Sequence, residues 1–86
     1  MEVSVELTLT PLTDAFESPI IEFIKRLREA EYRVLENPLS TQVYGDYDGI
    51  MKLLTQEIKR TFLSLDNVLI NIKIVKSNRS DYEPHF

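Results

Sequence analysis

The chain has 86 residues, of which 43% are hydrophobic and 28% are charged, with a formal net charge of −4 and no cysteine. This size supports one modest core, and the composition is that of a globular chain and not of a disordered one. The acidic balance disfavours nonspecific binding to nucleic acid or anionic lipid, and the lack of cysteine excludes disulfides and thiolate chemistry.

The single histidine, His85, is the penultimate residue, so we expect no catalytic or zinc site built on histidine. The sequence does not open with a basic segment followed by an apolar run, and no apolar stretch approaches the length that spans a bilayer. We therefore expect one domain over residues 1–86 that is cytoplasmic and does not insert into a membrane.

Six elements are expected along the chain. Alternating apolar residues predict a strand over residues 2–10. Ser18 and Pro19 suit the N-cap and first position of a helix over residues 18–31, whose outer face pairs Glu22 with Arg26. A strand over 32–36, a turn at Asn37–Pro38 and a strand over 39–46 form a hairpin. A helix over 47–64 and a strand over 68–75 follow, and residues 77–86 form a polar tail.

The order of these elements is strand, helix, strand, strand, helix, strand. It predicts an α+β, ferredoxin-like βαββαβ fold, with a four-stranded antiparallel sheet and both helices on one face. We further expect strands one and three to lie side by side in the middle and to run parallel. That arrangement would bring the loop with Asp14 beside Gly45, Asp46 and Tyr47.

The sheet face without helices is expected to be mixed in character. By the parity of the strands it carries these residues: Ser4, Glu6, Thr8, Arg33, Leu35, Gln42, Tyr44, Leu69, Asn71, Lys73 and Val75. Several of them are more apolar than those on a fully exposed face, so we expect a partner or a ligand to cover part of it, with an oligomer interface preferred.

Acidic residues near the two helix starts allow two interpretations. Asp14, Glu17, Asp46 and Asp48 are explained by capping and by the helix dipole, or else they attract a cationic ligand. Only Gly45 and Gly49 are present, so there is no glycine-rich cradle for a nucleotide. No nucleophile or metal set stands beside the carboxylates, and an enzyme is not expected.

Hydroxyl and aromatic side chains of the third strand provide a second candidate. Ser40 and Thr41 are either ordinary strand residues or a pair of hydroxyls that hydrogen-bond a small heterocycle. Tyr44 and Tyr47 could stack on such a ring, although tyrosines on a sheet usually pack or form interfaces. Glu6 points to the open face, as a solvated charge or as part of this site.

Two stretches resemble the YkoF-like family of thiamine- and hydroxymethylpyrimidine-binding proteins. They are Leu9-Thr10-Pro11-Leu12-Thr13-Asp14-Ala15-Phe16 and Leu39-Ser40-Thr41-Gln42-Val43-Tyr44-Gly45, and the likeness extends from residue 3 to about residue 76. The resemblance implies a ferredoxin-like fold without catalysis that binds the aminopyrimidine of thiamine or its precursor. Some members carry two fused copies, and single-copy members form dimers or tetramers.

The resemblance assigns individual positions. Ser40 and Thr41 match the family's hydroxyl pair, Asp14 its loop acid and Gly45 its strand-end glycine. Tyr44 and Tyr47 depart from it, because some members carry a charged residue at the first position and another apolar or aromatic residue at the second.

Two hypotheses of different class follow. The first is a homodimeric or homotetrameric protein that binds thiamine or hydroxymethylpyrimidine through Asp14, Ser40, Thr41, Tyr44, Tyr47 and Glu6, with no other cofactor and no nucleic-acid partner. The second is a ligand-free assembly module that associates through its open sheet face and strand edges.

Overall fold

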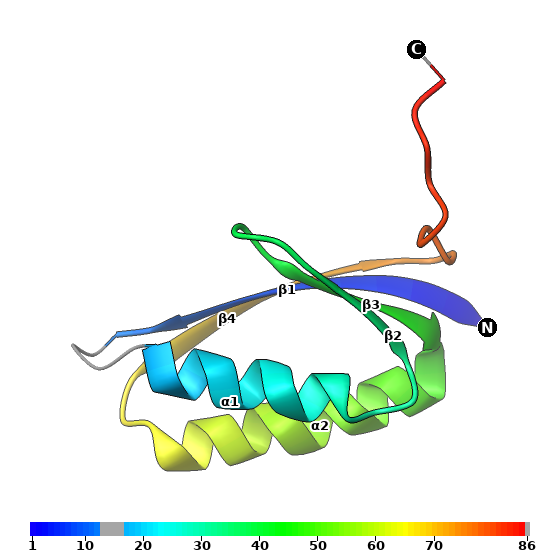
Figure 1. The fold of residues 1–86 in the computed structure, drawn as a ribbon. Helices are drawn as coiled ribbons and strands as arrows, with labels where there is room; N and C mark the ends of the chain where they lie inside the picture. The colour runs from blue at the N-terminus through cyan, green and yellow to red at the C-terminus, as the bar shows by residue number, and fades with distance from the viewer. Residues whose placement is uncertain (13–16, 86) are drawn as a thin grey trace.

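A computed structural model describes residues 1–12 and 17–85 of the chain (Figure 1). Its elements, in order, are β1 (Glu2–Pro11), α1 (Glu17–Arg28), β2 (Arg33–Glu36), β3 (Thr41–Asp46), α2 (Tyr47–Ser64) and β4 (Val68–Val75). The strands form one sheet in the order β2-β3-β1-β4, and both helices lie on one face of it (Figure 1). The predicted ferredoxin-like α+β fold is confirmed.

The direction expected for the central pair of strands is wrong. β1 and β3 run antiparallel, so Glu2 lies opposite Asp46 and Leu7 lies opposite Thr41. Consequently the end of β1 and the start of α1 lie at the end of the sheet opposite to Asp46. Glu17, the first residue of α1, is therefore not beside Asp46 and Asp48, as the expected acidic cluster requires, and Asp14 lies outside the described residues.

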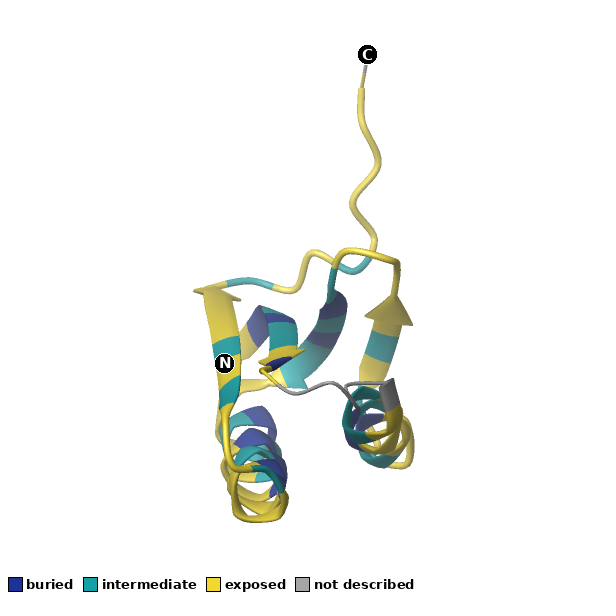
Figure 2. Cartoon of the chain, turned by 90° about the vertical axis from the view of Figure 1, so that its left-hand side faces the viewer, coloured by how far each residue is buried: buried dark blue, intermediate teal, exposed yellow. Residues whose placement is uncertain are grey.

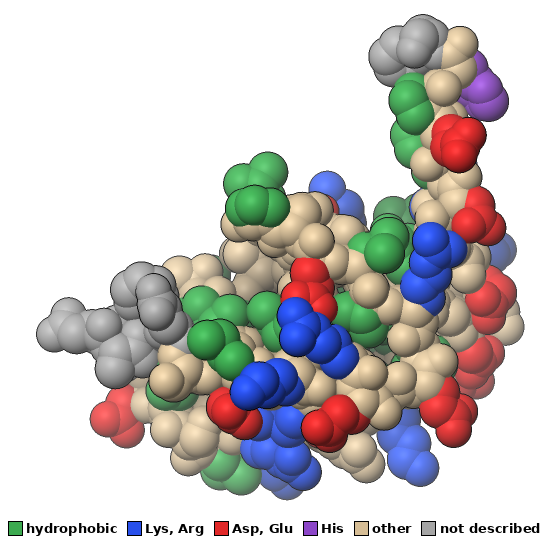
Figure 3. Space-filling model, in the orientation of Figure 1, with side chains coloured by type: hydrophobic (Ala, Val, Ile, Leu, Met, Phe, Trp, Pro, Cys, Tyr) green, Lys and Arg blue, Asp and Glu red, His purple; other side chains and the backbone are tan. Residues whose placement is uncertain are grey.

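The core lies between the sheet and the two helices (Figure 2). Eight apolar side chains, each at most 2% exposed, form it: Val3, Val5, Leu7, Phe23, Leu27, Val43, Ile50 and Leu54. The helix faces turned away from the sheet carry interspersed acidic and basic side chains (Figure 3). This division follows from the period-2 pattern of the strands and the 3.6-residue pattern of the helices.

An ion pair joins the two helices inside this layer. The carboxylate of Glu57 on α2 accepts a hydrogen bond from Nε of Arg26 on α1, and Nη2 of the same arginine lies 3.3 Å from Oγ1 of Thr61. The exposed fractions of the two charged side chains are 9% for Glu57 and 21% for Arg26. Arg26 therefore faces α2 and pairs with Glu57, and the expected surface pair with Glu22 is not formed.

The hairpin begins differently from the prediction. Oδ1 of Asn37 accepts hydrogen bonds from the backbone N–H groups of Leu39 (2.8 Å) and Ser40 (3.0 Å), which is an Asx-type turn. This turn uses residues 39 and 40, so β3 starts at Thr41. Directly before this turn, at the last residue of β2, Arg28 donates hydrogen bonds to both carboxylate oxygens of Glu36, and this hydrogen bonding lowers the pKa of that carboxyl.

Tyr32 packs where the end of β3 passes into α2. Its ring lies against Gly45 and Gly49, and a Cβ built on Gly45 would be 2.7 Å from Cδ1 of the ring. Gly45 also has φ of +154°, a conformation that residues with a side chain rarely adopt. The ring of Tyr32 therefore requires glycine at both positions, because a side chain at either one would occupy the space of the ring.

Asp46 caps α2, and its carboxylate accepts a hydrogen bond from the N–H of Gly49 at 3.1 Å. This bond is the main cause that lowers the pKa of Asp46. A group whose pKa is lower in the folded state stabilises the protein above its unfolded pKa of about 3.9, and the contribution is lost as the pH falls through the folded value.

We therefore expect the melting temperature of Asp46→Asn to fall less than that of the wild type between about pH 5 and pH 2, because asparagine caps without titrating. Circular dichroism melts at intervals across this range measure it. Asp66→Asn, in the exposed loop before β4, is the control. Parallel pH profiles for wild type and Asp46→Asn would contradict the assignment.

The chain after β4 turns away from the helices and rises above the open sheet face (Figures 1 and 2). Its start is held by Ser4, whose hydroxyl donates to the carbonyl oxygen of Ser77 (2.7 Å) and accepts from the N–H of Arg79 (2.8 Å). Arg33 and Asp81 add an exposed ion pair at 3.0 Å. In the part of the chain that the structure describes, no helix is long and apolar enough to cross a membrane.

Candidate functional site

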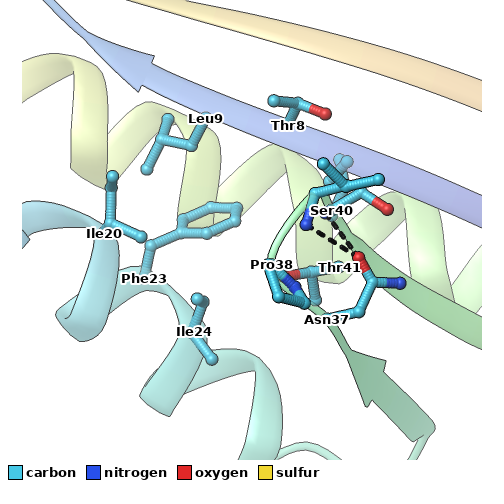
Figure 4. A pocket seen from close by; sticks show the side chains of 11 residues that line it. Thr8, Leu9, Ile20, Phe23, Ile24, Asn37, Pro38, Ser40 and Thr41 are labelled. Carbon is cyan, nitrogen blue, oxygen red and sulfur yellow. Dashed lines mark hydrogen bonds between the residues drawn. The ribbon is translucent and has the colours of Figure 1, made fainter.

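A cavity opens where β1 continues beyond β3. β3 pairs with residues 2–7 of β1, whereas β4 pairs with β1 as far as Pro11, so residues 8–10 have no strand on the hairpin side. The β2–β3 hairpin and α1 enclose this space, a cavity of about 180 Å³ that we call the hairpin pocket (Figure 4). Its lining residues are Leu7, Thr8, Leu9, Ile20, Phe23, Ile24, Asn37, Pro38, Leu39, Ser40 and Thr41.

The walls of the hairpin pocket are mainly apolar. Ile20, Phe23 and Ile24 of α1 lie on one side, and Pro38 of the turn lies on the other (Figure 4). Polar groups reach it from Thr8, Asn37, Ser40 and Thr41. An apolar cavity with a few convergent polar groups is the usual form of a small-molecule site.

Ser40 links the hairpin pocket to a polar network on the open sheet face. Its hydroxyl donates to Oε2 of Glu6 (3.0 Å) and accepts from Nε2 of Gln42 (2.6 Å). The other carboxylate oxygen of Glu6 lies 3.7 Å from Nζ of Lys73. Because the proton of Ser40 is donated to Glu6, this hydroxyl can offer the pocket only its remaining lone pair, as an acceptor.

A second hollow, of about 190 Å³, lies on the open face around this network. Its lining residues are Ser4, Val5, Glu6, Gln42, Tyr44, Lys73, Val75 and Arg79. Arg79 comes from the tail that Ser4 holds, so the hollow is bounded by sheet and tail together. It contains charges of both signs and, among the aromatic residues, only Tyr44.

The predicted site residues fall into separate groups. Ser40 and Thr41 both line the hairpin pocket, and Glu6 contacts it through Ser40. Tyr44 lies in the open-face hollow. Tyr47 is the first residue of α2, at the far end of β3 from the hairpin pocket, so the structure does not place it with the hydroxyls.

Two residues of the pocket were not among the predicted site residues. Phe23 reads as a core residue from its helical spacing, and its ring is buried at 2% exposure while still lining the cavity. Asn37 reads only as a turn residue. The sequence Asn37-Pro38 in a hairpin could have indicated its role, because an asparagine there forms an Asx turn, and this turn folds the hairpin tip over the pocket.

Comparison with known proteins gives structural matches alone. No family model matches the sequence, and no curated protein matches it. A crystal structure of a Streptococcus pneumoniae protein has a TM-score of 0.83 and 26% identity over 91% of this chain and 89% of that one. The structure of a domain of unknown function, DUF77, from Bacillus cereus has a TM-score of 0.75 and 14% identity over 96% and 83%.

The chain has the DUF77 fold. A third match, from Thermotoga maritima, bears the provisional name of a thiamine biosynthesis/salvage protein and has a TM-score of 0.82 with 15% identity over 90% of this chain and 85% of that one. The DUF77 and YkoF-like proteins thus share the architecture of this chain at low sequence identity.

Proposed function

We propose that the protein is a non-catalytic binding protein for thiamine or its hydroxymethylpyrimidine moiety and that it works as a homo-oligomer. The hairpin pocket is the observation that carries this proposal, because it contains the two hydroxyls that match the YkoF-like pattern. The name of the Thermotoga maritima protein with the same fold points to the same class of ligand.

The size of the pocket favours a single ring. Sites for drug-sized ligands hold roughly 300–1,000 Å³, and the hairpin pocket holds about 180 Å³. One flat ring can lie between Phe23 and Pro38, and the thiazolium of thiamine would extend toward solvent.

The polar groups suit the edge of an aminopyrimidine. That edge presents an amino donor beside a ring-nitrogen acceptor. Ser40 offers a lone pair, since its proton is donated to Glu6. Thr41 lines the pocket, and its hydroxyl makes no side-chain hydrogen bond among the described residues, so its proton is available to a ring nitrogen. Glu6 accepts the hydrogen bond of Ser40, and its negative charge favours an amino group bound to that serine.

Isothermal titration calorimetry tests this function. The protein is unfolded, dialysed free of ligand, refolded, and titrated with thiamine and with hydroxymethylpyrimidine in separate runs. We expect saturable heat at one ligand per chain for both, with similar affinities because the ring carries the recognition. Absence of heat in both titrations of a folded, oligomeric protein would overturn the ligand and favour the assembly module.

Thr41→Val tests the site itself. It removes the hydroxyl at nearly constant shape, and we expect the affinity for hydroxymethylpyrimidine to weaken about 3- to 10-fold, the usual value of one neutral hydrogen bond. Thr10→Val is the matched control, because it makes the same change at an exposed position of β1 that does not line the pocket. Equal affinities for the two variants would place the ligand elsewhere, and the open-face hollow would be the next site to test.

A further inference from the structure

The hydrogen-bond ladder between β1 and β3 stops beside the hairpin pocket. Leu7 lies opposite Thr41, and in the same register the next pair to exchange hydrogen bonds would be Leu9 with Leu39. The N–H of Leu39 donates instead to Oδ1 of Asn37, at 2.8 Å. The Asx turn thus takes the donor that would continue the ladder, and Leu9 lines the pocket without a strand on this side.

The backbone of Leu9 points into the gap that this turn leaves. In an antiparallel sheet, one residue directs both its N–H and its C=O to one neighbouring strand, and the next residue directs them to the other. The N–H of Tyr47 donates to the C=O of Met1 (2.8 Å), which continues the register of β1 with β3. The N–H of Leu12 donates to the C=O of Asn67 (3.0 Å), which continues the register of β1 with β4. Odd-numbered residues of β1 therefore face β3, so both polar backbone groups of Leu9 point to the hairpin side.

Neither group has a partner there. Within residues 1–12 and 17–85, the structure contains no hydrogen bond to the backbone of Leu9 from the hairpin side. The residue is half-buried and packs against the core, so its backbone is partly withdrawn from water. A partly desolvated donor and acceptor cost free energy while they are unpaired, and a ligand that supplies both partners recovers it.

We propose that the N–H and the C=O of Leu9 bind the edge of an amino-substituted aromatic ring. A ring nitrogen accepts the hydrogen bond of the N–H, and the adjacent amino group donates to the C=O. This inference deepens the proposed function, on which it rests for the identity of the ring. An aminopyrimidine has two amino protons and two ring nitrogens, so one of each remains for Ser40 and Thr41.

A sheet edge can also bind an extended peptide, which adds as a further strand. Such a peptide needs a row of donors and acceptors, and β1 offers a single residue here. Leu7 is already paired with Thr41, and the next residue that faces this side, Pro11, has no N–H. The pocket of about 180 Å³ between Phe23 and Pro38 also favours one ring over a strand (Figure 4).

Amide hydrogen exchange of the free protein, followed by NMR, tests this geometry without a ligand. Thr8 and Thr10 direct their N–H groups to β4, whereas Leu9 directs its N–H to the pocket. We expect the amide of Leu9 to exchange at least about 10-fold faster than those of its two neighbours, after correction for their intrinsic rates. Equal protection of the three amides would overturn the inference, because Leu9 would then already have a partner.

Ligand binding is observed on the same amide. The protein and hydroxymethylpyrimidine are both labelled with the heavy nitrogen isotope and mixed at saturation. We expect a scalar coupling across the hydrogen bond from the N–H of Leu9 to a ring nitrogen, together with slower exchange of that amide. The same pyrimidine without its amino group should bind at least about 10-fold more weakly, because the C=O of Leu9 is then left unpaired.

Leu9→Pro and Leu9→Ala separate the N–H from the side chain. Both variants lose the leucine side chain, and only the proline variant also loses the N–H, which no strand uses. We expect Leu9→Pro to bind hydroxymethylpyrimidine roughly 3- to 10-fold more weakly than Leu9→Ala, the value of one neutral hydrogen bond. Circular dichroism shows whether both variants fold, and the coupling in the wild-type protein decides if the proline variant does not.

The outcomes separate this inference from the proposed function. Saturable binding of hydroxymethylpyrimidine without coupling or protection at Leu9 would overturn the inference and leave the function in place. Protection of Leu9 by ortho-aminopyridine, with no binding of hydroxymethylpyrimidine, would support recognition by the backbone and overturn the thiamine-related ligand. Protection by a valine tripeptide and by neither ring would show strand addition instead. If none of the three probes protects Leu9 or binds, both proposals are overturned.

Discussion

Replacing Glu57 by leucine should lower the free energy of unfolding by about 3 kcal/mol, the lower end of the cost of breaking a buried ion pair. The substitution keeps the helix propensity and much of the volume, but it leaves the guanidinium of Arg26 between the helices without its carboxylate. Arg26 keeps 21% of its side chain exposed, so it can recover part of its hydration, which is why we do not expect the full penalty. Urea denaturation followed by circular dichroism measures the change.

The double variant Arg26→Met, Glu57→Leu is the decisive control. Replacing both partners by apolar side chains of similar size is commonly neutral or stabilising, because neither charge then has to be desolvated. We therefore expect it to recover most of the lost stability. A loss equal to that of Glu57→Leu alone would mean that the helices need the pair for their packing and not merely for charge balance.

Gly45→Ala should destabilise the protein by about 3 kcal/mol, from two sources. A residue with a side chain at φ of +154° stores roughly 1–3 kcal/mol of backbone strain, and the new methyl group would lie 2.7 Å from Cδ1 of Tyr32. Removing the ring should therefore relieve only part of the cost. In a Tyr32→Ala background we expect Gly45→Ala to cost about 1–2 kcal/mol, measured by urea denaturation of all four members of the cycle.

Gly49 provides the contrast. Its position is helical with ordinary φ, and the hydroxyl of Tyr32 occupies the space of its missing Cβ. Gly49→Ala should destabilise the wild type, yet stabilise the Tyr32→Ala variant by roughly 0.5–1 kcal/mol, the gain of alanine over glycine in a helix. A stabilising Gly45→Ala in that same background would show that the positive φ of Gly45 carries no strain.

Local patterns of the sequence are sufficient to find the elements. The alternation of Val3, Val5 and Leu7 and the helical spacing through α2 predict β1, α2 and β4 to within one residue of the observed bounds. Polar turn chemistry is where the prediction falls short. The pattern after Asn37 continues like a strand, and only the hydrogen bonds to its side chain show that β3 starts two residues later.

Contacts between elements were harder to predict from the sequence. The buried positions of α2 follow the spacing Ile50, Leu54, Glu57, Thr61, so Glu57 occupies a core position, but a glutamate there reads as a surface residue until its arginine partner is placed. The prediction of the site failed in part for the same reason, because it also depended on how separate elements are placed. Tyr44 and Tyr47 lie close in sequence to Thr41, yet the extended strand and the following helix carry them away from the hairpin pocket.

The pairing of β1 with β4 has a consequence for how the chain folds. Ser4 lies opposite Val75, so the central strand of the sheet acquires one of its two neighbours from the other end of the described chain. Closing such a long loop costs entropy before the contacts that reward it exist, and folds dominated by distant pairings fold slowly. During synthesis β1 must wait for β4 to emerge, and until then the backbone N–H and C=O groups on that edge of β1 are open to pairing with other chains.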